Sequence, residues 1–213
     1  MNQIFHVEPQ SRLSDIVMSR PATMTVLARL GIVLGLGDDT VEMVSRRLGI
    51  STRLLTSMLN TLLNPDFVPR ILLDSHDHDA LNDYLAKSNA YYRHVALPNI
   101  ERHFEMLVTK SGTSNNLELM LRFFHELKQQ WVKCLDGATS AVGNDAPADT
   151  TDSIENRIGD LMSMIVIHLQ GSYDANLALA VLLAVSGLRD DIALNNRIRN
   201  LVTHPGQHGS TQE

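Results

Sequence analysis

Apolar side chains recur at intervals of three and four residues over most of the chain, and this helical period most constrains the fold. No segment keeps the strict alternation of apolar and polar residues that a half-buried strand requires. The period predicts long helices over residues 80–110, 116–135, 153–169 and 175–203. Because four long helices with simple connections pack into a bundle, the sequence predicts an all-α protein.

Two of these segments carry further expectations. Pro98 interrupts the first, and since proline cannot donate a helical hydrogen bond, we expect a kink or a local break there. The segment 175–203 is apolar nearly all round in its first half, which predicts burial on every side. In the segment 153–169, His168 shares a face with the apolar residues. Residues 136–151 are low in bulky side chains and rich in turn-forming residues, which predicts a mobile loop.

Short helices broken by glycines are expected before residue 66. The pattern predicts helices over 23–30, 41–48 and 52–62, with Gly49 ending the second of them. Asp39 and Thr40 both precede that second helix as candidate cap residues. The last two helices have the outline of a helix-turn-helix.

As a DNA reader, the helix pair of residues 40–62 is poor. Its second helix offers only Arg53 as a basic residue, whereas base and phosphate contacts usually need several. The net charge of −6 also argues against a broad phosphate-binding surface. We therefore expect a packed helical unit, and keep a DNA-binding regulator as an alternative.

The expected domain organisation has four parts. A small helical domain covers residues 1–66, a linker 67–79, the bundle 80–205 and a disordered tail 206–213. The linker contains the run Asp74-Ser75-His76-Asp77-His78-Asp79, which is rich in metal-ligand types. Six adjacent residues cannot all converge on one ion, so we interpret the run as a solvated cap at a helix N-terminus.

Composition limits the compartment. No run approaches the ~18 apolar residues that a membrane span needs, and the opening MNQIFHVEPQ lacks the basic and apolar regions of a secretory signal. Cys134 is the sole cysteine, which excludes an internal disulfide framework and fits a reducing compartment. We expect a soluble, cytoplasmic protein without a membrane partner.

Several stretches together resemble the iron-sulfur cluster repair di-iron proteins. They are LARLGI, LGLGDDTVEMV, KSNAYY, PNIER and FFHELK, and the resemblance extends over nearly the whole chain. It implies a small N-terminal domain followed by a hemerythrin-like four-helix bundle of the HHE cation-binding type. It also implies a stress or redox setting.

Members of that family hold two irons with histidines and with H-x-x-x-E pairs, one helical turn apart. No histidine here is followed by a carboxylate four residues on, and no E-x-x-x-H or E-x-x-H occurs. Where some relatives carry a cysteine pair in the N-terminal domain, this chain has Gly35 and Leu36. The family's ligand positions align with Asn89, with Cys134 and Ala138, with Thr151 or Asp152, and with Asn195 and Arg199.

The leading hypothesis is therefore a binding or regulatory module without catalytic, cofactor-binding or metal-ligating residues. It would act through a protein partner or by forming a homodimer. We do not expect an enzyme, because no nucleophile elbow or phosphate-binding glycine loop is present. The alternative is a metal-dependent protein of the repair type with an atypical ligand set. That set would be drawn from His94, His103, His125, Cys134, His168, Asp190 and Asp191.

Overall fold

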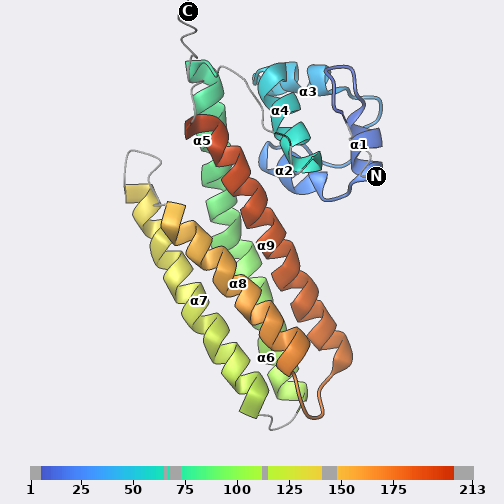
Figure 1. The fold of residues 1–213 in the computed structure, drawn as a ribbon. Coiled ribbons are helices and arrows are strands. Elements are labelled where there is room, and N and C mark those ends of the chain that lie inside the picture. Colours follow the sequence, from blue (N-terminus) through green and yellow to red (C-terminus); the bar gives the residue numbers. More distant parts are fainter. Residues whose placement is uncertain (1–5, 65–66, 68–72, 112–114, 141–147, 204–213) are drawn as a thin grey trace, which may run out of the picture. The chain divides into compact units, whose positions relative to one another are not determined.

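The computed structural model describes residues 6–64, 67, 73–111, 115–140 and 148–203, and this part of the chain is helical without a strand. The predicted all-α class is confirmed. One isolated antiparallel bridge joins Arg12 to Thr40. The helices, shown in Figure 1, are α1 (Leu13–Ser19), α2 (Thr23–Arg29), α3 (Val41–Leu48), α4 (Thr52–Leu63), α5 (Ser75–Tyr91), the π-helical turn η1 (Tyr92–Ala96), α6 (Leu97–Lys110), α7 (Asn115–Ser140), α8 (Ala148–His168) and α9 (Ala175–Thr203).

The chain divides into two compact units. The first unit comprises Met1–Ser88 and Leu194–Glu213, and the second comprises Asn89–Ala193. Each boundary falls inside a helix, α5 in one case and α9 in the other. The division thus differs from the domain limits at residues 66 and 80 expected from the sequence. The reason is that both ends of the 80–205 segment pack with the N-terminal helices.

The first unit has two hydrophobic clusters that meet different faces of α4. One cluster gathers apolar side chains of α1 to α4, with Leu55 and Leu59 from α4. The other joins α4 to α5 and to the last turns of α9, with Leu54 and Met58 from α4. Helix α4 is therefore a central packing element of this unit.

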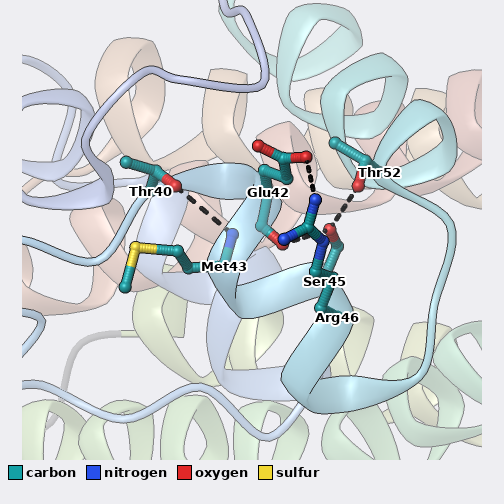
Figure 2. Close-up of polar contacts among 6 residues, drawn as sticks. All are labelled: Thr40, Glu42, Met43, Ser45, Arg46 and Thr52. Carbon is teal, nitrogen blue, oxygen red and sulfur yellow. Dashed lines mark hydrogen bonds and ion pairs between the residues drawn. The ribbon is translucent and has the colours of Figure 1, made fainter.

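Local sequence signals set where α3 and α4 begin and where α3 ends. Figure 2 shows the capping contact at the start of α3. The hydroxyl of Thr40 accepts the amide of Met43 at 3.3 Å, so Thr40 rather than Asp39 caps α3. Ser51 caps α4 in the same way, accepting from the amide of Leu54 at 3.0 Å. Gly49 ends α3 with a φ of 68°, a left-handed conformation that glycine adopts without a steric cost.

The second unit has a single hydrophobic core. Helices α6, α7 and α8 and the first turns of α9 run alongside one another, as Figure 1 shows. Phe104 of α6 and Phe124 of α7 lie stacked in this core, with ring centroids 6.0 Å apart. The predicted apolar stripes of these helices supply its buried residues.

Pro98 has the expected local effect. The chain makes a π-helical turn just before it, and the amide of Leu97 donates to the carbonyl of Tyr92. Because Pro98 lacks an N–H, the regular helical ladder cannot run through this position, and a wider turn joins α5 to α6. The predicted break is confirmed as a π turn.

Three sequence expectations about individual residues and segments were wrong. Helix α7 continues to Ser140 and α8 begins at Ala148, so helix occupies much of the predicted loop 136–151. His168 is exposed rather than in the apolar stripe of α8. Leu179 and Leu183 of α9 are 54% and 62% exposed, because the core covers only one face of that helix.

None of the described helices combines the length and the apolar character that crossing a bilayer requires. The predicted tail at residues 206–213 and residues 68–72 of the predicted linker lie outside the described residues.

Candidate functional site

The would-be recognition helix α4 is buried on nearly all sides. Of its side chains only Arg53 is exposed, with 50% of its side-chain surface open to solvent. Its guanidinium donates to Asp77 Oδ2 at 3.0 Å, so it is already engaged by α5. A helix that enters the major groove must present several side chains to base edges. This packing does not favour DNA recognition by the helix pair 40–62.

The acidic run of residues 74–79 lies at the N-terminus of α5, as expected: Asp74 precedes the helix and the other five residues begin it. The run is not solvated throughout. Asp74 accepts the amide of Asp77 at 2.8 Å, which is an N-cap hydrogen bond. The carboxylate of Asp77 is fully buried and pairs with Arg53. His76 Nε2 contacts the carbonyl oxygen of Gly49. The run thus holds the α3–α4 turn against α5, and its side chains do not converge on one point.

The environment of Asp77 shifts its acidity in a defined direction. Burial raises the pKa of the carboxyl group, but the Ser51 hydroxyl, the Arg53 guanidinium and the backbone amide of Asp74 lower it by more. The net pKa therefore lies below the ordinary value of 3.8. Asp77 is ionised at neutral pH and stabilises the first unit in that form.

This lowered pKa predicts a stability that depends on pH. The folded state binds fewer protons than the unfolded state, so the stabilisation is complete above pH 3.8 and is lost as the pH falls through the lowered pKa. We expect Asp77→Asn to lower the free energy of unfolding by about 1 to 2 kcal/mol at pH 7, because it removes one charge-assisted hydrogen bond to a half-exposed arginine.

Urea unfolding at a series of pH values checks this. The difference between wild type and Asp77→Asn should shrink below pH 3.8, whereas Asp83→Asn, at an exposed ion pair on the same helix, should differ little at any pH. A stability difference between wild type and Asp77→Asn that stays constant down to the lowest pH would contradict a lowered pKa of Asp77.

The described residues of the second unit do not offer the buried histidine and carboxylate donors of a di-iron centre. Such a centre needs histidine and carboxylate side chains inside the helices. Among side chains that the structure describes, every buried residue of the second unit is hydrophobic. The buried polar residues that the structure describes all belong to the first unit, and they are Thr23, Arg29, Ser45, Ser57, Asn60, Thr61, Asp77, Ser88 and Asn195.

The positions that align with the family's iron ligands fit that result. Asn195 is buried, and Ser88 donates to its side-chain oxygen at 3.4 Å, which is an uncharged contact. Asn89, Cys134 and Arg199 are half-buried. The side chains of Ala138, Thr151 and Asp152 lie outside the described residues. In the N-terminal domain, Leu36 packs into the hydrophobic cluster of α1 to α4.

The alternative ligand set is not assembled either. His94, His168 and Asp190 are exposed, whereas His103, His125, Cys134 and Asp191 are half-buried. Within the described residues, the one group of three ligand-type side chains whose donor atoms lie within 4.8 Å of one another contains only His125 from that set. His103 instead contacts the carbonyl oxygen of Asn99 at 2.7 Å.

That group, which we call the α6–α7 cluster, consists of Glu101, Glu105 and His125. The two glutamates lie one turn apart on α6, and the histidine comes from α7. His125 Nε2 is 3.4 Å from Glu101 Oε1, and the other oxygen of Glu101 accepts from Lys128 Nζ at 2.5 Å. The side chains of Glu101 and His125 are 25% and 38% exposed, so solvent reaches the cluster.

Two carboxylates and an imidazole are a mixed oxygen and nitrogen donor set, which suits borderline divalent cations. A search for metal-ligand spacing along single helices missed the cluster, because its third member lies twenty residues beyond Glu105 on the next helix. The signal that could have found it is a glutamate pair at i, i+4 opposite a histidine on a neighbouring antiparallel helix.

Comparisons with protein families, with curated proteins and with solved structures found no match for this chain.

Proposed function

We propose that this chain is a binding or regulatory module: a hemerythrin-like four-helix bundle behind a small N-terminal helical domain, without a di-iron centre. The proposal keeps the resemblance to the iron-sulfur cluster repair proteins, and with it a stress or redox setting in the cytoplasm. The observation that carries it is that every buried side chain described in the second unit is hydrophobic. A core of this kind stabilises a scaffold, and its described buried side chains include no histidine or carboxylate to bind iron.

The outer face of α9 supports a role in protein contacts. Leu179 and Leu183 lie one turn apart and are both more than half exposed. Large apolar side chains that gather on a surface typically mark an interaction site. The occupant that we propose is a second copy of the chain, because a single helix face can pair with its own copy about a two-fold axis.

Iron content tests the first half of the proposal. We expect chain expressed in iron-supplemented medium and purified without chelators to contain far fewer than the two irons per chain of a di-iron protein. The reason is that the buried side chains described in the second unit include no histidine and no carboxylate. Elemental analysis together with the absorption spectrum measures this. Two irons per chain with an oxo-bridge absorption band would overturn the proposal in favour of the metal-dependent alternative.

Light scattering on the same sample tests the second half. A molar mass near twice the chain mass of 23.7 kDa is the expected result. Leu183→Glu should return it to the monomer value, since a charge cannot be buried cheaply at such a contact. The control is Leu119→Glu, at a leucine of α7 that is half exposed. A wild-type chain that stays monomeric at high concentration would exclude self-association through α9.

A further inference from the structure

We propose that Glu101, Glu105 and His125 form a surface site for one divalent transition-metal ion of the Zn²⁺ type, clamping α6 to α7. The site is separate from the di-iron centre discussed above, because its residues lie near the surface and can hold one ion at most. It would bind metal whether or not the chain acts as a protein-binding module.

The positions of the three donors carry the first step. Glu101 and Glu105 are four residues apart, so their side chains project from the same face of α6. His125 projects from α7 toward them, and all three donor atoms lie within 4.8 Å of one another. A tetrahedral zinc ion has ligand bonds of about 2.0 to 2.2 Å, so small side-chain rotations bring the three atoms onto one ion.

The number and type of donors carry the second step. Three protein ligands leave the fourth position of a tetrahedral ion open to water, as solvent-accessible zinc sites do. Calcium and magnesium prefer oxygen ligands alone, and an imidazole nitrogen disfavours them. The donor set therefore selects a borderline cation over these two ions.

A charged side chain beside the cluster allows a further test of the proposal. Lys128 Nζ is 2.5 Å from Glu101 Oε2 and neutralises one of the two carboxylates. The oxygen that faces His125, Oε1, is left for the metal. An ammonium group on the same carboxylate repels a dication, so Lys128 lowers the affinity of the site. Removing this lysine should strengthen metal binding, whereas an ion-pair network without a metal role predicts no such gain.

Calorimetric titration of the full-length, tag-free chain with ZnCl₂ tests the assignment. We expect one equivalent of tight binding, and at least about a tenfold loss of affinity in His125→Ala and in Glu105→Gln. The matched controls are His94→Ala and Glu118→Gln, which alter exposed residues outside the cluster. They should bind as the wild type does. Circular dichroism checks that each variant is folded. We expect every variant to fold, because the altered side chains lie at or near the surface.

Lys128→Met provides the second arm. Relief of the repulsion between the ammonium of Lys128 and a dication bound to the same carboxylate should tighten Zn²⁺ binding about threefold or more, allowing for screening by salt. Titration with CaCl₂ in place of ZnCl₂ should give no binding at the cluster. Equal Zn²⁺ affinity in wild type, His125→Ala and Glu105→Gln would overturn the proposal, as would weaker binding by Lys128→Met.

Discussion

Phe104→Ala is expected to lower the free energy of unfolding of the second unit by about 3 to 5 kcal/mol. Phe104 is fully buried and stacks on Phe124, with the ring planes only 20° apart. Alanine would remove the whole ring and leave a cavity between α6 and α7 that neighbouring side chains can fill only in part. The lost apolar burial and the cavity both destabilise the core.

Urea unfolding followed by circular dichroism measures this effect as a lower midpoint with a similar slope. Leu119→Ala on α7 is the control, because that leucine is about half exposed. It should change stability by roughly 0.5 kcal/mol or less. If Phe104→Ala proved as mild as Leu119→Ala, the two rings would not be packed as described.

Asn60→Ala should destabilise the first unit by about 2 to 4 kcal/mol. The side chain of Asn60 accepts from the amide of Val7 at 2.9 Å and donates to the carbonyl of Val7 at 2.9 Å. Val7 is fully buried, so both its backbone groups would lose their partner away from water. An unsatisfied buried group costs roughly 1 to 3 kcal/mol, and here there are two.

Two measurements check this second result. Urea unfolding should show the loss for Asn60→Ala and very little for Asn82→Ala, which changes an exposed asparagine on α5. Hydrogen exchange should show that the amide of Val7 loses protection in Asn60→Ala. Unchanged protection of that amide would mean that Asn60 does not hold the segment before α1.

Most of the helices could be predicted from the sequence alone. The bounds of α3 and α9 match the predicted ranges, and α4 extends one residue further than expected. These elements have strong local signals, such as the cap residues Thr40 and Ser51 and the left-handed Gly49. Local signals act within one or two turns, so sequence spacing alone exposes them.

Where such signals were weak, the helix boundaries in the structure differ from the predicted ones. Helix α5 begins at Ser75 because Asp74 caps it, although the sequence pattern placed the helix start at Ala80. The apolar start of α9 pointed to full burial, yet Leu183 is exposed. A uniformly apolar helix has no intrinsic inward face, so only its neighbours decide which side is covered.

The candidate site shows the same limit more clearly. Spacing along one helix identifies Glu101 and Glu105 as neighbours, but their position beside His125 depends on how α6 and α7 rotate against each other. The pairing of Arg53 with Asp77 also joins residues of different helices. Neither contact can be predicted from the spacing of residues along the sequence.

The helical class, the end of α3 at Gly49 and the break before Pro98 follow from the sequence by itself, because backbone hydrogen bonding and the conformations of glycine and proline act locally. Only the tertiary structure decides that α4 is packed between two hydrophobic clusters and that the buried side chains described in the second unit are all hydrophobic. It also decides that the α6–α7 cluster forms. These outcomes depend on the packing of helix faces, and the helical period of one segment does not specify the segment that will cover it.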